Sequence, residues 1–297
     1  MLKSRRSFAA LTIFAAASLA LLSAYGQSAS SQGFVERGDA KLFYKSEGSG
    51  PAMVLIHGYP LSGELFKNNR SALSQAGYRV VTVDLRGFGR SSAPQSEPGS
   101  IATYAQDVLA VMDKLEIQKT VVGGMSMGGM IAFEMYRRAP ERFSGLALLT
   151  TTANPAGDVE KTFWNAIAAK AESKGSASLV PELMKDMLTG ATQAKKPELV
   201  RFLSGLIAGA SKRGAVAAAK ALAGRPDSLP TLATITVPTI IVAGREDTLI
   251  PLVFSQKMQQ GIKGSQLVVL EGASHAAVIE APGLLNRALL KWARNLR

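Results

Sequence analysis

The segment that most constrains the fold is a serine flanked by glycines, Gly124-Met125-Ser126-Met127-Gly128. An apolar run from Thr120 to Val122 leads into it, and an amphipathic helical pattern follows from Ile131. A strand, a tight turn and a helix in this order predict a serine held in a strained conformation at the tip of the turn, where only glycine fits at the flanks. Such a serine can act as a nucleophile; the alternative is a glycine-rich helix start that only packs closely.

The composition limits the kinds of reaction in which this serine can take part. The chain has 297 residues, of which 47% are hydrophobic, enough for one large α/β domain with an insertion. It contains no cysteine and two histidines, which excludes disulfides and thiolate chemistry and argues against a catalytic zinc site, so we expect no metal and no cofactor. The net charge of +12 comes from basic residues interspersed with acids, so we expect a solvated basic surface and no nucleic-acid partner.

Residues 1–26 are typical of a signal peptide. Three basic residues precede an uncharged apolar run from Phe8 to Leu22, which is shorter than the ~20 residues of a membrane span. Cleavage after Gly26 or Ser28 would leave a mature chain without stable membrane association, whereas an uncleaved anchor is the alternative. Ser4-Arg5-Arg6-Ser7-Phe8 resembles the twin-arginine signal, so we expect an exported protein, periplasmic or secreted, by that route or by general secretion.

Short apolar runs alternate with amphipathic helical segments over most of the mature chain. A hairpin is expected around Gly38-Asp39. The expected strands are Met53–Ile56, Arg79–Val83, Gly145–Leu149, Thr239–Ala243 and Gln266–Leu270. The expected helices are Gly63–Gln75, Ile101–Leu115, Val253–Gln260 and Leu284–Asn295. This alternation predicts an α/β fold with a mostly parallel central sheet covered by helices on both faces.

Residues 152–232 interrupt this alternation. They are helical in pattern, rich in Ala, Lys and Gly, and contain no convincing strand. The residues expected to face inward are Trp164, Ile167, Leu183, Met187, Phe202 and Leu206. The predicted organisation is therefore a core in two parts, 27–151 and 233–297, with residues 152–232 inserted between them.

A serine hydroxyl needs a general base, and histidine is the usual choice near neutral pH. Only His57 and His275 exist. His275 lies in a small-residue loop between the last expected strand and the last helix, at the sheet edge where active sites of open α/β sheets lie. We therefore favour His275 as the base over His57, which directly follows a buried strand. The alternative for His275 is an ordinary loop histidine.

The imidazole in turn needs a carboxylate to hold its tautomer. Glu246 and Asp247 both follow the strand expected at Thr239–Ala243. We favour Asp247, and the alternative for each is an ordinary loop carboxylate paired with Arg245.

The chain order Ser126, Asp247, His275 belongs to a wider pattern. The other motifs are His57-Gly58-Tyr59-Pro60, Asp84-x-Arg86-Gly87-x-Gly89-x-Ser91, Gly244-x-x-Asp247-x-x-x-Pro251 and Gly272-x-x-His275. Together with the serine turn they resemble the α/β-hydrolase superfamily. The resemblance implies the α/β-hydrolase fold, the catalytic acid at Asp247, and a structural turn, not a phosphate-binding loop, at Asp84–Ser91.

Acyl transfer also needs donors for the negative charge that develops on the carbonyl oxygen. Met127, at the start of the helix after Ser126, supplies one backbone N–H. The resemblance places the second oxyanion-hole donor on Tyr59 and gives His57 a structural role in bracing that loop.

The insertion resembles the helical cap of capped members of the superfamily. In that case Met125, Met130 and Trp164 would line an apolar substrate site, although a role in core packing is an equal alternative.

The expected function is hydrolysis of small carboxylic esters or lactones through an acyl-enzyme on Ser126. The motifs look most like those of enol-lactonases, aryl esterases and metal-free haloperoxidases or perhydrolases. Perhydrolysis, C–C bond hydrolysis, or ligand binding with slow turnover are the alternatives. Haloalkane dehalogenases and epoxide hydrolases are disfavoured because they carry a carboxylate where Ser126 stands. The expected partner is a small-molecule ester or lactone.

Overall fold

The computed structural model describes residues 30–93, 95 and 99–296, so the predicted signal segment lies outside the described residues. The chain forms an eight-stranded sheet in the order β1-β2-β4-β3-β5-β6-β7-β8. The strands are β1 Ser30–Arg37, β2 Ala40–Glu47, β3 Ala52–Ile56, β4 Arg79–Val83, β5 Thr120–Met125, β6 Phe143–Leu149, β7 Thr239–Gly244 and β8 Gln266–Leu270. The pairings β1–β2 and β2–β4 are antiparallel and all others are parallel, as the sequence pattern predicted.

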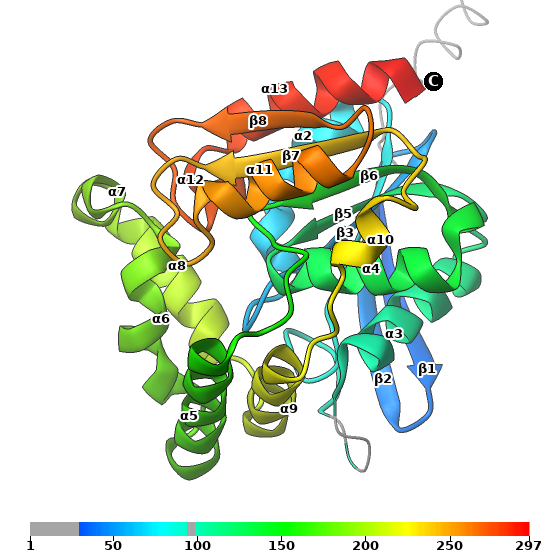
Figure 1. Cartoon of the computed structure of the whole chain (residues 1–297). Helices are drawn as coiled ribbons and strands as arrows, with labels where there is room; N and C mark the ends of the chain where they lie inside the picture. The colour runs from blue at the N-terminus through cyan, green and yellow to red at the C-terminus, as the bar shows by residue number, and fades with distance from the viewer. Residues whose placement is uncertain (1–29, 94, 96–98, 297) are drawn as a thin grey trace, which may run out of the picture.

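Helices cover both faces of the sheet (Figure 1). One face carries α3 (Ile101–Lys114), α4 (Met127–Arg138) and α11 (Leu252–Gly261), and the other carries α2 (Lys67–Gln75) and α13 (Pro282–Ala293). All residues of β5 and β7 are buried, because a parallel strand between two helical layers has no solvated face. These uninterrupted apolar runs are why the central strands could be predicted closely.

Some helix boundaries differ from the prediction. The helix expected over 63–75 begins as a 3-10 turn, Gly63–Phe66, where Ser62 Oγ accepts the N–H of Glu64 at 3.3 Å. The last helix begins two residues earlier than expected, at Pro282, because proline fits the first position of a helix. The short helix α12 (Ala277–Glu280), directly after His275, was not predicted.

Residues 152–238, all of which the structure describes, contain no strand. Their helices are α5 Asp158–Lys174, α6 Val180–Met187, α7 Gly190–Lys195, α8 Pro197–Ala208, α9 Lys212–Ala223 and α10 Leu229–Leu232. Helices α5 to α9 lie together beyond the end of the sheet toward which the parallel strands point (Figure 1). We refer to residues 152–232 as the helical insertion.

The inward faces of the helical insertion were predicted only in part. The four expected residues on α5 and α6, Trp164 to Met187, are buried. On α8 the prediction was incomplete, because Phe202 and Leu206 are half-buried and pack against the core, whereas the fully buried residues are Leu203 and Ile207. Both pairs are apolar and four residues apart, so periodicity alone could not choose between two adjacent stripes of one helix.

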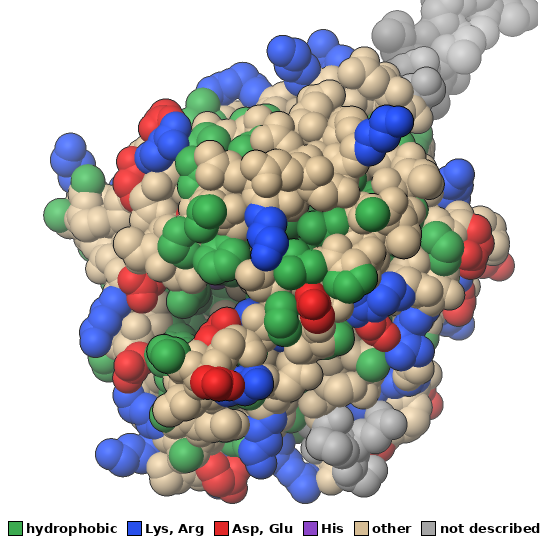
Figure 2. Space-filling model, viewed as in Figure 1, with side chains coloured by type: hydrophobic (Ala, Val, Ile, Leu, Met, Phe, Trp, Pro, Cys, Tyr) green, Lys and Arg blue, Asp and Glu red, His purple; other side chains and the backbone are tan. Residues whose placement is uncertain are grey.

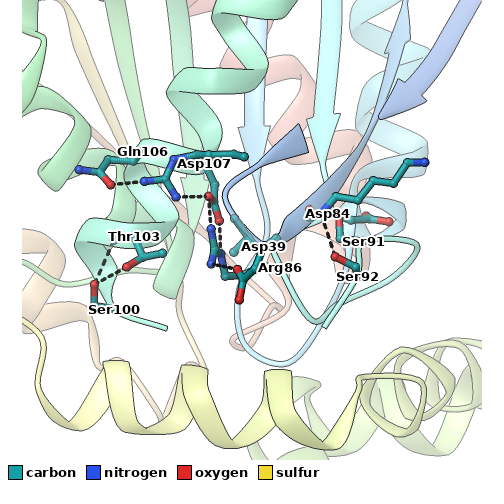
Figure 3. A network of polar contacts seen from close by, with 12 residues as sticks. Asp39, Asp84, Arg86, Ser91, Ser92, Ser100, Thr103, Gln106 and Asp107 are labelled. Carbon is teal, nitrogen blue, oxygen red and sulfur yellow. Dashed lines mark hydrogen bonds and ion pairs between the residues drawn. The ribbon is translucent and has the colours of Figure 1, made fainter. Parts of the chain in front are cut away.

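The turn after β4 is held by charged groups within the core (Figure 3). Arg86 is fully buried and donates from Nε and Nη2 to both carboxylate oxygens of Asp107 on α3, at 2.6 and 2.7 Å. Gly87 has a φ of 88°, and an added Cβ there would lie 2.4 Å from Gly214 Cα of α9. These contacts support the predicted structural role of the turn. In the described chain, no helix is long and apolar enough to cross a membrane.

Candidate active site

Ser126 lies between β5 and α4 in a backbone conformation that L-residues rarely adopt, with φ 53° and ψ −119°. Its N–H donates to Leu149 O of the neighbouring strand at 3.0 Å, and its carbonyl accepts the Thr151 hydroxyl at 2.6 Å. These contacts hold the strained residue in place. The serine is partly exposed and stands at the N-terminus of α4, where free N–H groups favour negative charge.

The flanking glycines are required by close backbone approach. An added Cβ on Gly124 would lie 2.2 Å from Gly128 O, and one on Gly128 would lie 2.1 Å from Ile56 O at the end of β3. Any side chain at either position would therefore displace the backbone of β3 or of α4. The glycines in the G-x-S-x-G pattern are needed for this packing, as the sequence predicts.

His275 follows β8 and is paired with the predicted acid. Its Nδ1 lies 2.9 Å from Asp247 Oδ2, and both side chains are buried. Asp247 Oδ1 accepts the N–H groups of Leu249 and Ile250 at 3.0 and 2.8 Å. Because an ionised carboxylate can only accept, Nδ1 of the neutral ring carries the proton and Nε2 keeps a lone pair. Nε2 has no hydrogen-bond partner among the described residues, and no hydrogen bond joins it to Ser126.

Glu246, the alternative acid, binds the backbone of the His275 loop and not the imidazole ring. Its carboxylate accepts the N–H groups of Gly272 and Ala273 at 3.3 and 3.0 Å and makes no contact with His275 among the described residues. Arg245 pairs with Glu271 at 2.8 Å, and not with either candidate acid. The alternative in which Arg245 pairs with Glu246 or Asp247 is therefore wrong.

His57 is fully buried after β3, and both of its ring nitrogens are engaged by the backbone. Nδ1–H donates to Gly58 O at 2.8 Å, and Nε2 accepts the N–H of Leu85 at 3.0 Å. Burial lowers the pKa of His57 to about 4, so the ring is neutral at pH 7. Neither nitrogen is left for a serine hydroxyl, and the ring instead joins the loop after β3 to the loop after β4.

The loop after His57 packs directly against the serine turn. An added Cβ on Gly58 would lie 2.7 Å from Met125 Sδ and 3.0 Å from Ser126 Cβ. The N–H of Tyr59 has no acceptor among the described residues, and the N–H of Met127 is the first of α4 and lacks an intrahelical partner. The Tyr59–Pro60 bond is cis. Burial raises the pKa of the Tyr59 hydroxyl, so this side chain stays neutral.

The three residues expected to line an apolar site are all buried, and they differ in what they contact. Met125 is fully buried and Met130 is nearly so. Trp164 packs edge-on against the ring of Tyr59, with centroids 5.3 Å apart, and donates from Nε1 to Glu160 at 3.2 Å. Trp164 therefore joins the helical insertion to the loop that carries Tyr59.

Two acidic residues that support the histidine loop were not singled out from the sequence. Glu280 is buried on α12; its Oε2 accepts the N–H of Ser274 at 2.7 Å, and its Oε1 accepts the N–H and hydroxyl of Thr189 at 2.8 and 2.7 Å. Asp186 on α6 accepts the Thr248 hydroxyl at 2.7 Å, and its carbonyl accepts the Ser274 hydroxyl at 2.8 Å. Nothing in the sequence near either residue signals these long-range contacts. The three threonines directly after β6, which include Thr151, are the one available signal for the support of Ser126.

Comparisons with known proteins agree with this architecture. The family model described as alpha/beta hydrolase fold matches residues 51–282. A putative non-heme chloroperoxidase of Synechocystis is 33% identical over 249 residues, which cover 79% of this chain and 88% of that protein. The 3-oxoadipate enol-lactonase 2 of Acinetobacter baylyi is 31% identical over 252 residues, 84% of this chain and 92% of that one. The structure of a thermophilic esterase from Thermogutta terrifontis superimposes with a TM-score of 0.84 at 29% identity, covering 91% of this chain and 99% of that chain.

Proposed function

The chain belongs to the alpha/beta hydrolase fold family, and we propose that it cleaves small carboxylic esters or lactones through an acyl-enzyme on Ser126. The observation that carries the proposal is the orientation of His275. Its Nδ1–H is held by Asp247 at 2.9 Å, which leaves Nε2 as the lone-pair nitrogen without a partner in the described chain. A lone pair held in a buried, fixed ring is what a general base for a serine hydroxyl requires.

In the first half of the reaction, His275 Nε2 takes the proton from Ser126 Oγ while Oγ attacks the ester carbonyl carbon. Negative charge develops on the carbonyl oxygen, and the N–H groups of Tyr59 and Met127 stabilise it. Asp247 stabilises the imidazolium. The tetrahedral intermediate collapses, His275 gives its proton to the departing alcohol, and the acyl group remains on Ser126. Catalytic hydrogen bonds often form fully only with substrate present, so the absence of a Ser126–His275 bond is compatible with this step.

In the second half, a water molecule loses a proton to His275 Nε2 and attacks the acyl carbon. A second oxyanion forms in the same site, the bond to Ser126 Oγ breaks, and His275 returns the proton to that oxygen. The carboxylic acid leaves. If hydrogen peroxide takes the place of water, the product is a peracid, and the likeness to a putative non-heme chloroperoxidase favours this as the second candidate activity.

We also propose that the helical insertion acts as a cap and that the protein works outside the cytoplasm. Support for the cap comes from its contacts with the histidine loop, among them the Ala276 N–H to Met187 O bond of 2.8 Å. A structure with a bound ester analogue that touches only the core would contradict it. Export rests on the pattern of residues 1–26. A full-length chain recovered only from the cytoplasm would contradict it.

The catalytic proposal is tested with a series of p-nitrophenyl and lactone substrates, with and without hydrogen peroxide. We expect turnover by the wild-type protein and loss of it in Ser126→Ala, with binding retained. Full activity of Ser126→Ala would refute the mechanism. Tight binding of a small molecule with no turnover of any ester would favour a ligand-binding role.

A further inference from the structure

A small cavity lies between α7 of the helical insertion and the loops that follow β7 and β8. In Figure 1, α7 lies beyond the ends toward which these two strands point. The volume of the cavity is about 290 Å³, close to the lower end of the range of about 300–1,000 Å³ that is usual for small-molecule sites. Its walls include Thr189, Ala191, Lys195, Lys196, Glu246 and Gly272. None of the residues to which we assign catalysis lines it, so it is separate from the candidate active site.

The walls of the cavity are mainly apolar, although most of the residues that form them are polar. Lysine side chains cover apolar surface with their methylene groups and keep the ammonium group in water. The methylene groups of Lys195 and Lys196 and the methyl group of Ala191 therefore face the cavity, and the two ammonium groups lie at its rim. A ligand that fits this arrangement has an apolar part inside and a charged group at the rim.

The charge of the walls selects the sign of that group. Lys195 and Lys196 are exposed, and neither forms a salt bridge with an acidic residue of the described chain. Glu246 accepts the N–H groups of Gly272 and Ala273 at 3.3 and 3.0 Å, so the backbone already engages its carboxylate. Two lysines against one carboxylate leave the walls positive, which favours an anionic ligand. Figure 2 shows further Lys and Arg side chains along the margin that the helical insertion forms.

The cavity also adjoins both supports of the segment that precedes His275. Glu246, in its wall, binds the first two N–H groups of that segment. Thr189, also in its wall, donates its N–H and hydroxyl to Glu280, whose other oxygen accepts the Ser274 N–H at 2.7 Å. A ligand in the cavity touches both supports, so its binding is expected to alter the position of the His275 ring.

We propose that this cavity is a second ligand site, for small carboxylates with a short apolar chain, and that its occupancy is transmitted to the His275 ring. The carboxylate lies between the ammonium groups of Lys195 and Lys196, and the chain lies against Ala191. The acid released by ester hydrolysis belongs to this class, so the site would let the product regulate the enzyme. That consequence rests on the proposed function, whereas the binding does not.

The first test is steric. Ala191 is exposed on α7 and lines the cavity, so Ala191→Phe fills the cavity from a surface position. Ala194 is exposed on the same helix and does not line the cavity, which makes Ala194→Phe the matched control. We expect Ala191→Phe to lower the affinity for hexanoate at least about tenfold, because the ring occupies the space of the apolar chain. Ala194→Phe should stay within about twofold of the wild type.

The second test removes charge. The double variant Lys195→Gln/Lys196→Gln should weaken the binding of hexanoate at least about fivefold, because two exposed ion pairs are lost. Lys185→Gln/Lys220→Gln, at two exposed lysines of the insertion that do not line the cavity, removes the same charge and should change the affinity by less than about twofold. Glu246→Gln should tighten binding about twofold, because a like charge leaves the wall.

Binding is measured by calorimetric titration of the protein with hexanoate, and with 1-hexanol as the neutral ligand of the same length. The response of His275 is followed by NMR, since the chain has only two histidines and the other one is fully buried and neutral. We expect hexanoate to bind at least about fivefold more tightly than 1-hexanol and to shift the ring resonances of His275. Both signals should persist in Ala194→Phe and be lost in Ala191→Phe.

Several results would overturn the inference. They are no binding of hexanoate by the wild type, unchanged binding and an unchanged His275 shift in Ala191→Phe, equal binding of hexanoate and 1-hexanol, equal losses in the two charge variants, or weaker binding by Glu246→Gln. Binding in the cavity that leaves the His275 resonances in place would overturn the transmission to the ring. Both measurements are made without an ester, so failure of the proposed function would not change what they show.

Discussion

The two histidines lie in loops at the same edge of the sheet, one after β3 and one after β8, and both rings are buried. What separates them is the use of their ring nitrogens. The backbone occupies both nitrogens of His57, at 2.8 and 3.0 Å. A carboxylate occupies one nitrogen of His275, and the other has no partner in the described part of the chain. A histidine whose two nitrogens are satisfied is a structural link, whereas one with an oriented, unpartnered nitrogen is equipped for proton transfer.

The largest expected effect comes from removing the base. His275→Ala should lower kcat by about 10⁴-fold or more, because Ser126 then has no proton acceptor, while KM changes little. The measurement is steady-state kinetics on the ester that the wild type cleaves best. Ser126→Ala should lower kcat by a similar factor, and the double variant should be no worse than either single variant, because the two groups act as a unit.

His57→Gln is the matched control for this prediction. The amide oxygen of glutamine can accept the Leu85 N–H, so a folded variant should keep at least about a tenth of the wild-type kcat. Loss of activity in His57→Gln with full activity in His275→Ala would exchange the two roles.

The next largest effect on kcat is expected from substitution of the catalytic acid. Asp247→Asn should lower kcat by about 10³- to 10⁴-fold, because an amide no longer fixes the Nδ1–H tautomer or stabilises the imidazolium. Glu246→Gln should change kcat by less than about threefold, because Glu246 is exposed and water can replace either of the contacts that its carboxylate makes with the N–H groups of Gly272 and Ala273. The same kinetics, with thermal unfolding as a check on folding, decide between them. A large loss confined to Glu246→Gln would assign the acid to Glu246.

Most of the fold could be predicted from the sequence because the signals for strands and turns lie in neighbouring residues. The bounds of β4 and β8 were predicted as observed, and the glycines around Ser126 indicated the tight turn. Long-range packing was not predictable in this way. The choice between Phe202 and Leu203 as the inward residue of α8 depends on what α8 packs against. The contacts of Glu280 join residues 91 positions apart, and no spacing in the sequence encodes them.

The structural role of His57 predicts a loss of stability. His57→Ala leaves the buried Leu85 N–H without an acceptor and creates a cavity, which should lower the free energy of unfolding by about 3 kcal/mol at pH 7. This is measured by urea denaturation. An equal loss of stability in His275→Ala would weaken the distinction between the two rings.

The pH dependence of stability tests whether His57 is buried and neutral in the folded protein. The pKa of His57 is about 4 in the folded protein and about 6.5 in the unfolded chain. Between these values the unfolded chain binds a proton that the folded protein does not. The stabilisation is therefore fully present above about pH 6.5 and is lost as the pH falls through about 4, amounting to about 3 kcal/mol. His57→Ala lacks this term, so its stability should approach that of the wild type between pH 6.5 and 4. A stability difference that stays constant over this range would contradict the buried, neutral state of His57.

The smallest effect expected concerns the loop that carries His275. Glu280 is its buried acceptor, with one oxygen on Ser274 N–H and the other on Thr189. Glu280→Gln replaces one acceptor oxygen with an NH₂ group. That group must face a hydrogen-bond donor, either on Ser274 or on Thr189, so the loop shifts. We therefore expect kcat to fall about tenfold with KM nearly unchanged. Glu271→Gln, which alters an exposed ion pair with Arg245, is the matched control and should retain wild-type kcat.

Thr189→Val separates support of the histidine from attachment of the helical insertion. It removes the hydroxyl donor to Glu280 and keeps both backbone donors, so Ser274 remains bound and kcat should fall by no more than about twofold. A tenfold loss in Thr189→Val would mean that the insertion, and not the Ser274 contact, sets the position of His275. A normal kcat in Glu280→Gln would show that the Asp247 hydrogen bond alone is sufficient to orient the ring. In that case the distinction between His57 and His275 would depend on the ring partners alone, without a contribution from the loop that carries His275.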